Sequence, residues 1–386
     1  MPAPGSGPLR LLVLQPTPFC NLDCDYCYLA GRHDRSRMAP AILDAALDRV
    51  LSSPHIDGPF TLLWHAGEPL TLPPAFYDEA TERIGAALQR HGLPPDLVRQ
   101  SLQTNGLTIN EAWCDCFVRN GIHVGVSIDG PAALHDRHRR TRTGLPSHAA
   151  VLRGISWLQR RGIPFNVIAV LTADSLDHAD DLYDFFTGHG ISDVGFNMEE
   201  TEGVNGHSSL ERSPADRTGL EERYQRFLLR FWQRTLAEPG KLRLREFDGV
   251  MSIACGPERL QHTDMNRPFA IVNVDVHGNL SSFDPELLSV ATERFGDFSF
   301  GNVLSHSLEA VTSNERFQAV SQEIAAGVDH CRSTCAYFGL CGGGAGSNKF
   351  FEHGRFDGAE TQACRYRIKL VADVVLTQME SALQLA

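Results

Sequence analysis

Three cysteines lie close together near the start of the chain, in the segment FCNLDCDYCY at residues 19–28. Cys20, Cys24 and Cys27 have the spacing C-x3-C-x2-C, and the aromatic Tyr26 stands directly before the last of them. Three thiolates on one loop can bind three irons of a cubane cluster and leave the fourth iron without a protein ligand. Structural zinc usually takes four ligands, often as two pairs, and no second pair is near. The spacing therefore favours a [4Fe-4S] cluster with one open iron, the alternatives being a small zinc site or unrelated buried cysteines.

Small and polar residues follow several later apolar runs. The sequence reads AGEP at residues 66–69, QTNG at 103–106, SIDGP at 127–131 and FNMEE at 196–200. Small residues let a backbone come close to a ligand, and polar side chains at a strand end can bind one. Each segment taken alone is equally compatible with an ordinary turn after a strand. His65, beside the first of them, is the one histidine that we single out among the sixteen.

Six strand-like runs alternate with helical patterns in the first 240 residues. We expect strands at 10–16, 60–65, 97–103, 123–128, 165–172 and 193–198, and helices at 40–53, 74–90, 110–119, 149–161, 177–187 and 215–236. Repeated strand–helix units predict an α/β fold with a parallel sheet and right-handed crossovers. No glycine-rich nucleotide motif is present, so we expect a partial, TIM-like (β/α)6 barrel. Such barrels place their chemistry at the C-terminal ends of the strands, which is where the cysteine loop and the later segments lie.

The pattern changes near residue 240, where we place a boundary between a core domain (1–240) and a second domain (241–386). Residues 269–283 alternate and turn at His277-Gly278-Asn279, which predicts a β-hairpin. Helices are expected at 308–326 and 365–385. Between them lie Cys331, Cys335 and Cys341, then three glycines, and later Cys364.

Those four C-terminal thiolates suffice to saturate one cubane cluster, with a zinc knuckle as the alternative. Cys255 is expected to be a free thiol. Cys114 and Cys116 lie on a predicted helix, where side chains two residues apart point in different directions, so we expect them to serve packing.

Composition limits the class of protein. The chain has 386 residues and a formal net charge of -12, which argues against a nucleic-acid or anionic-membrane partner. Residues 1–10 lack the basic and apolar regions of a signal peptide, and no apolar run is long enough to span a membrane. We therefore expect a cytoplasmic protein whose ten cysteines are reduced and free to bind metal.

The cysteine segment resembles the cluster loop of radical S-adenosylmethionine (SAM) enzymes. The resemblance implies that SAM chelates the open iron and is split reductively to a 5′-deoxyadenosyl radical, with electrons from an external flavodoxin- or ferredoxin-type donor. AGEP is similar to the family's Gly-Gly-Glu-Pro motif, whose backbone binds the SAM ammonium group, while Glu68 would complement its charge. The segment HDRHR at 135–139 matches the family's HD-x-x-R, which implies that Ser127 and Arg139 hold the SAM carboxylate; Arg137, Arg140 and Arg142 are its rivals. The full implied SAM site is Tyr26, Ala66, Gly67, Glu68, Gln103, Asn105, Ser127, Arg139, Asn197 and Met198.

The C-terminal cysteines are similar to the SPASM/twitch extension of radical SAM enzymes, which holds auxiliary [4Fe-4S] clusters. Two positions depart from its seven-cysteine pattern, because Phe283 and Ala345 stand where the pattern has cysteine. The resemblance therefore implies one auxiliary cluster, held by Cys331, Cys335, Cys341 and Cys364. It also implies that Asp284 takes a proton from the substrate, although an aspartate before Pro285 could simply belong to a turn.

Within this family the chain resembles cyclophane-forming peptide maturases (GrrM/OscB type), through LQPTPFCNLDC at 14–24, YFGLCGGG at 337–344 and SNK at 347–349. The implied substrate is a ribosomally made precursor peptide. The radical would take a hydrogen from a side-chain β-carbon, and that carbon would join an aromatic ring of the same peptide. More distantly the chain is similar to anaerobic sulfatase-maturing enzymes, which oxidise a serine or cysteine to formylglycine. A zinc-bound, non-catalytic peptide-binding protein is the alternative from another class.

Overall fold

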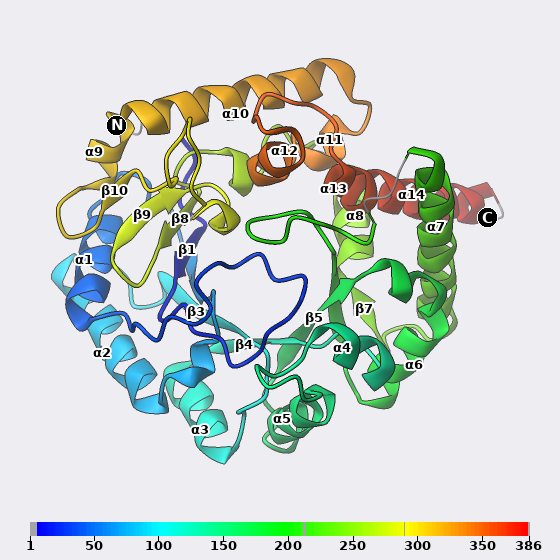
Figure 1. Ribbon diagram of the computed structural model, residues 1–386, viewed down its shortest axis with the longest axis horizontal. Coiled ribbons are helices and arrows are strands. Elements are labelled where there is room, and N and C mark those ends of the chain that lie inside the picture. The colour runs from blue at the N-terminus through cyan, green and yellow to red at the C-terminus, as the bar shows by residue number, and fades with distance from the viewer. Residues whose placement is uncertain (1–5, 211–213, 289, 385–386) are drawn as a thin grey trace.

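The computed structural model describes residues 6–210, 214–288 and 290–384, except for the side chains of 214–218. Its centre is a curved parallel sheet with helices around the outside, and the cysteine loop lies in the middle (Figure 1). The six expected strands pair in chain order, each parallel to the next. They are β1 (Leu11–Leu14), β2 (Phe60–Trp64), β3 (Val98–Thr104), β4 (His123–Ser127), β5 (Phe165–Leu171) and β6 (Asp193–Met198). The expected α/β fold is confirmed.

The crossover helices agree with the sequence pattern to within about two residues at each end. They are α1 (Pro40–Leu51), α2 (Pro74–Arg90), α3 (Glu111–Asn120), α5 (His148–Arg160), α6 (Ala179–Gly188) and α7 (Pro214–Ala237). A short helix that the sequence did not predict, α4 (Ala132–His138), follows β4 and carries most of the HDRHR segment. Cys114 and Cys116 are fully buried in α3, as expected of packing residues.

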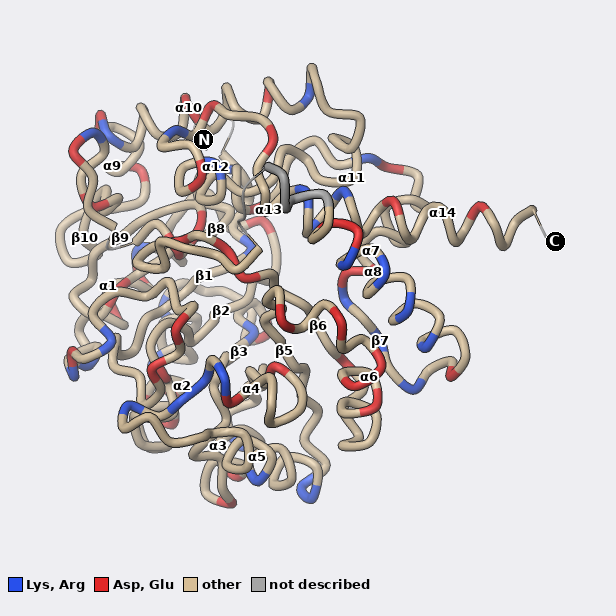
Figure 2. The backbone as a smooth tube through the Cα atoms, turned by 45° about the vertical axis from the view of Figure 1, so that its right-hand side comes forward, with Lys and Arg blue, Asp and Glu red and all other residues tan. Residues whose placement is uncertain are grey.

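Aromatic and charged contacts fix the helices around the sheet. The ring of Trp64 on β2 meets that of Tyr77 on α2 edge to face at 5.5 Å, and Tyr77 in turn meets Trp113 on α3 at 5.6 Å. Acidic positions of α6 lie beside basic positions of α7 (Figure 2), where Arg230 pairs with Asp180 at 2.9 Å. Such exposed pairs contribute little each, roughly 0.2–1 kcal/mol, so the buried rings account for most of the packing energy.

The sheet continues beyond both edges of the expected barrel. A two-residue strand, β7 (Arg243–Leu244), pairs with β6 and leads into α8 (Arg245–Cys255). At the other edge β8 (Ile271–Val274) runs parallel to β1, and β9 (Asn279–Ser282) and β10 (Gly301–Asn302) follow antiparallel. The expected hairpin is confirmed, and Asp275 closes its turn by accepting hydrogen bonds from the amides of residues 277 and 279. One sheet thus spans residue 240, and the two-domain division stays a prediction.

The C-terminal part contains more short helices than expected. They are α9 (Leu308–Thr312), α10 (Glu315–Thr334), α11 (Phe338–Cys341), α12 (Gly346–His353), α13 (Gln362–Cys364) and α14 (Leu370–Gln384). The single helix expected at 308–326 is wrong, because the Asn314 side chain accepts hydrogen bonds from the amides of Arg316 and Phe317 and starts a new helix. The final helix begins with a π-helical turn, Arg365–Lys369, and its predicted end at 385 lies outside the described residues. Among the helices of the described part, none combines the length and apolar character needed to cross a bilayer.

Candidate active site

A cavity of about 380 Å³ opens at the C-terminal ends of the parallel strands. The three N-terminal cysteines and all of the residues implied for SAM line it, together with Asp284. The N-terminal segments meet in one place, as expected when each follows a strand of one parallel sheet. Asp284 joins them from the turn after the antiparallel strand β9. Their individual roles toward SAM and iron stay predictions.

The thiols of the cysteine loop are protected from solvent. Cys24 is buried and Cys20 and Cys27 are half-buried. Burial, with the nearby Glu68 carboxylate, raises the pKa of Cys20 to about 12, and burial also raises that of Cys24 to about 12. A thiol that coordinates a metal is deprotonated, so a bound metal would favour the thiolate form that burial disfavours. Within the described residues no three acidic, histidine or cysteine side chains converge on a site for a single metal ion.

The AGEP turn supports the cysteine loop through close backbone contact. Both Ala66 and Gly67 have left-handed backbones, with φ of 66° and 69°. A Cβ added at Gly67 would lie 2.3 Å from the carbonyl oxygen of Thr17, and the Glu68 amide donates to the carbonyl of Phe19 at 2.8 Å. The residues just before Cys20 therefore lie directly on this turn, which only glycine at position 67 permits.

Glu68 holds the ends of two strands together. Its Oε1 accepts hydrogen bonds from Leu70 N (2.9 Å) and Thr104 Oγ1 (2.7 Å), and its Oε2 accepts one from Asn105 N (2.7 Å). Burial raises the pKa of Glu68 to about 7 in spite of these hydrogen bonds. Asn105 in turn donates from Nδ2 to Oδ1 of Asn21 inside the cysteine loop, at 2.7 Å. The carboxylate thus positions the cavity wall; the charge-complementing role implied for it stays a prediction.

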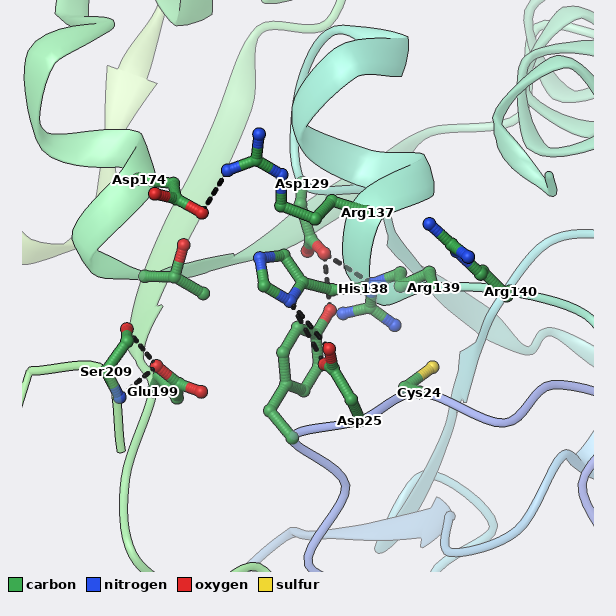
Figure 3. A network of polar contacts seen from close by, with 12 residues as sticks. Cys24, Asp25, Asp129, Arg137, His138, Arg139, Arg140, Asp174, Glu199 and Ser209 are labelled. Carbon is green, nitrogen blue, oxygen red and sulfur yellow. Dashed lines mark hydrogen bonds and ion pairs between the residues drawn. The ribbon is translucent and has the colours of Figure 1, made fainter. Parts of the chain in front are cut away.

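Arg139 is fixed by a carboxylate that the sequence analysis did not select (Figure 3). Asp129, 2% exposed, accepts from Arg139 Nε at 2.8 Å and from the Tyr26 hydroxyl through the same oxygen, while its other oxygen accepts from Val170 N at 2.9 Å. Burial would raise the pKa of Asp129, but the charge of Arg139 holds it below the usual range. Asp129 lies within the quoted segment SIDGP, so its position after a strand was the available signal.

The rival arginines lie elsewhere. Arg137 pairs with Asp174, and Arg140 donates to the backbone oxygen of Asp136. Arg142 donates to the carbonyls of Cys20 and Arg32, each at 3.2 Å, so it braces the cysteine loop from outside. Of these four arginines only Arg139 lines the cavity, which favours it as the carboxylate-binding group.

A smaller polar network involves the other selected residues. Gln103 Nε2 donates to Ser127 Oγ at 2.9 Å. Asn197 Oδ1 accepts from Arg245 of α8 at 2.9 Å. Burial lowers the pKa of His65 to about 4, and its Nε2 lies 3.5 Å from the Tyr28 hydroxyl.

The opposite wall of the cavity is acidic, and most of it was missed from the sequence. Asn348 Nδ2 donates to Glu200 Oε2 (2.9 Å) and to Glu202 Oε1 (2.8 Å). Arg367 pairs with Glu200 at 3.3 Å, and Glu286 also lines this wall. Glu200 and Asn348 fall within segments quoted above, but nothing local in the sequence marks Arg367, whose partner is 167 residues away.

Asp284 lies in this wall, and only one of its two carboxylate oxygens accepts a hydrogen bond from a described residue. It is 1% exposed, and its Oδ2 accepts from Ser347 N at 2.9 Å, whereas its Oδ1 has no hydrogen-bond partner among the described residues. Burial raises the pKa of Asp284 to about 6, against the lowering effects of Ser347 and Arg367, and the charge of Glu200 raises it further. Burial and the charge of Asp284 raise the pKa of Glu286 to about 8.

The C-terminal cysteines line a second cavity of about 160 Å³. Cys331, Cys335, Cys341 and Cys364 all contribute to it, so the structure brings the predicted auxiliary ligands together. Burial, followed by the charges of the other three cysteines, raises the pKa of Cys341 to about 11. Four thiolates around one enclosed space fit a cubane cluster. Cys255 is exposed and lines neither cavity.

The sequence is similar to a known family and to several known proteins. Residues 14–186 match the Radical SAM superfamily. The chain therefore contains a radical SAM domain. An uncharacterized protein of Synechocystis sp. is 50% identical over 380 residues, which cover 98% of this chain and 94% of that protein. The serine-type anaerobic sulfatase-maturating enzyme of Bacteroides thetaiotaomicron is 28% identical over 332 residues, or 81% of this chain and 77% of that enzyme.

Solved structures share the radical SAM fold. The structure described as native anSMEcpe with bound AdoMet and Cp18Cys peptide has a TM-score of 0.74 at 21% identity, covering 98% of this chain and 100% of that one. SuiB of Streptococcus suis bound to its precursor peptide SuiA has a TM-score of 0.57 at 16% identity, covering 93% and 76%.

Gly67→Ala should selectively damage the N-terminal cluster of this radical SAM enzyme. The new Cβ would displace residues 17–19, which directly precede Cys20. We expect iron per chain after anaerobic reconstitution to fall by about half, because the auxiliary ligands are untouched. Gly92→Ala is the matched control: Gly92 also has a left-handed φ, of 64°, but a Cβ there meets nothing within 4 Å. Full iron occupancy in Gly67→Ala would contradict the packing argument.

Proposed function

We propose that this radical SAM enzyme is a peptide maturase that oxidises a side chain of a ribosomally made precursor peptide and joins its β-carbon to an aromatic ring of the same peptide. The single observation that carries an oxidative role is Asp284, a buried carboxylate with one unpartnered oxygen in the same cavity as the three N-terminal cysteines. The peptides bound in the structures of anSMEcpe and SuiB support a peptide as the substrate class.

The residues present fit the groups that this chemistry needs. Cys20, Cys24 and Cys27 would hold three irons of a [4Fe-4S] cluster, and the strand-end residues would hold SAM against the fourth. When bound and reduced by an external donor, this pair supplies a 5′-deoxyadenosyl radical that takes one hydrogen atom from the substrate carbon. Arg139, oriented by Asp129, would bind the SAM carboxylate.

The protein would supply the acceptors for the rest of the oxidation. After the hydrogen atom has left and the carbon–carbon bond has formed, the substrate must lose one electron and one proton to restore the aromatic ring. Asp284 Oδ1 would take the proton. The electron would enter the auxiliary cluster, whose cavity shares four lining residues with the main one: Met265, Ala345, Asn348 and Arg367.

A second candidate function is formylglycine formation on a peptide. It is favoured by the similarity to the serine-type sulfatase-maturating enzyme, which covers 81% of this chain. The same proton and electron acceptors would serve it, since serine also loses two hydrogens when it becomes an aldehyde.

Metal content separates both enzymes from a zinc-bound scaffold. We expect about eight irons per chain in anaerobically reconstituted protein, four for each cubane. Replacement of Cys331 and Cys364 by alanine should halve this number and leave SAM cleavage by the first cluster. One or two zinc ions per chain with no iron would support the scaffold instead.

The product distinguishes the two oxidations. We expect co-expression with a matching precursor peptide to yield a peptide two hydrogens lighter. A carbon–carbon crosslink blocks tandem-mass fragmentation between the joined residues and gives no reaction with an aldehyde-specific hydrazide. A hydrazide-reactive product would establish formylglycine formation, and unchanged mass after anaerobic turnover with SAM and reductant would count against both.

Asp284→Asn should stop product formation while hydrogen abstraction continues. Loss of a general base typically costs 10²–10⁴-fold in rate, so we expect that loss in product with 5′-deoxyadenosine still released. In the parent enzyme, Asp284 must be ionised to act, and its pKa of about 6 predicts that single-turnover product formation falls as pH drops through about 6.

Glu286→Gln is the matched control for Asp284→Asn. Glu286 lines the same wall, and its pKa of about 8 keeps it protonated at neutral pH, so an amide there should preserve the acid limb near pH 6. Glu200, Arg367 and Ser347 also face Asp284 and are unchanged in both variants. Equal loss of product in the two variants would show that Asp284 is not the specific proton acceptor.

A further inference from the structure

A lysine is buried against the auxiliary cysteines. Lys349 of α12 is 4% exposed, and its Nζ donates to the Gly327 carbonyl at 2.9 Å and to Cys331 Sγ at 3.4 Å. Neither acceptor is a carboxylate, and in the described chain Lys349 takes part in no ion pair with an acidic side chain. Lys349 thus lines the second cavity, and its ammonium group lies against a carbonyl and a sulfur with no carboxylate as counter-charge among the described residues.

Burying an ammonium group is costly unless a negative charge lies close to it. A neutral carbonyl offsets only part of that cost. A Cys331 thiolate bound to a cluster would supply the missing charge, at the position where the sulfur already lies. The fold also makes room for the contact, because a Cβ at Gly327 would come within 3.0 Å of Lys349 Nζ and 2.2 Å of the Phe356 carbonyl oxygen.

We propose that Lys349 raises the reduction potential of the auxiliary cluster and so makes it the acceptor of the electron that the substrate loses. A cubane with four thiolates is one unit more negative when reduced, and a fixed positive charge beside a ligand sulfur stabilises that state more than the oxidised one. Net charge and hydrogen bonds to the sulfurs are among the factors that set such potentials. This inference rests on the proposed function for the direction of electron flow, but the effect on the potential does not.

The same cavity contains a lysine that should have a smaller effect. Lys369 also lines it, and its charge lowers the pKa of Cys364, but Lys369 pairs with the Glu360 carboxylate, which offsets part of that charge. Arg367 lines it as well and pairs with Glu200. Among these cations Lys349 alone has a cysteine sulfur as a hydrogen-bond partner.

The test is an anaerobic redox titration of the reconstituted full-length protein, followed by electron paramagnetic resonance. Cys20, Cys24 and Cys27 are first replaced by alanine so that only the auxiliary cluster contributes. In this background Lys349→Met should lower the equilibrium constant for reduction at least tenfold, which for a one-electron couple is about 59 mV. Lys369→Met should change it clearly less than Lys349→Met does, because Glu360 offsets part of the Lys369 charge.

A second neutral variant tests whether the shift in potential comes from the lost charge or from altered packing. Lys349→Gln keeps a hydrogen-bond donor but not the charge, so it should shift the potential in the same direction at full iron occupancy. A purely structural lysine would alter iron content without moving the potential. No shift in either variant, or an equal shift in Lys369→Met, would overturn the proposal. Loss of the cluster from both Lys349 variants would assign Lys349 to cluster assembly and overturn it too. If the enzyme failed to oxidise a peptide but the Lys349 variants still shifted the reduction potential, the proposal for Lys349 would hold and only the proposed function would fail.

Discussion

The first turn of α12 connects the two cavities, and the proposed chemistry depends on it. Ser347, Asn348 and Lys349 are consecutive, and successive side chains of a helix point about 100° apart. The Ser347 amide, free because it begins the helix, binds Asp284; Asn348 binds two carboxylates of the shared wall; Lys349 reaches Cys331. One rigid turn therefore fixes the distance between the proposed proton acceptor and the proposed electron acceptor.

Burial also controls the charge of the acidic wall. Burial, with the charge of Glu200, raises the pKa of Glu202 well above its usual value. The pKa of Glu286 is raised to about 8, so Glu286 carries a proton at neutral pH. Glu200 is paired with Arg367. Asp284, with a pKa of about 6, is ionised at neutral pH and, among the described residues, has no ion-pair partner of its own. Four acids in one wall thus yield one base, because repulsion and desolvation keep the others neutral or paired.

Periodicity and motif position were enough to predict the first half of the site. Strand ends in one parallel sheet meet at one edge, so Cys20, Glu68 and Ser127 could be brought together from spacing alone. Arg367 could not, because its contact with Glu200 depends on how α14 and its π-helical turn pack against β6. The break at Asn314 was also missed, since a capping side chain inside a continuous apolar pattern gives a weak signal. The sequence shows that the residues of the acidic wall are carboxylic acids. It does not show which of them stays ionised, because that depends on how deeply each is buried.

Phe283 stands at one of the two positions where the SPASM/twitch pattern, to which the C-terminal cysteines are similar, has a cysteine. Phe283 is fully buried, and its ring stacks on Phe317 at 6.0 Å, so side chains fill the space. Its φ of 71° is strained for a bulky residue, and the Asn273 side chain holds it by donating to its carbonyl at 3.2 Å. The left-handed turn lies directly before Asp284, and Asp284 enters the cavity from it. The packing of Phe283 therefore supports a strained backbone directly beside the carboxylate on which the proposed oxidation depends.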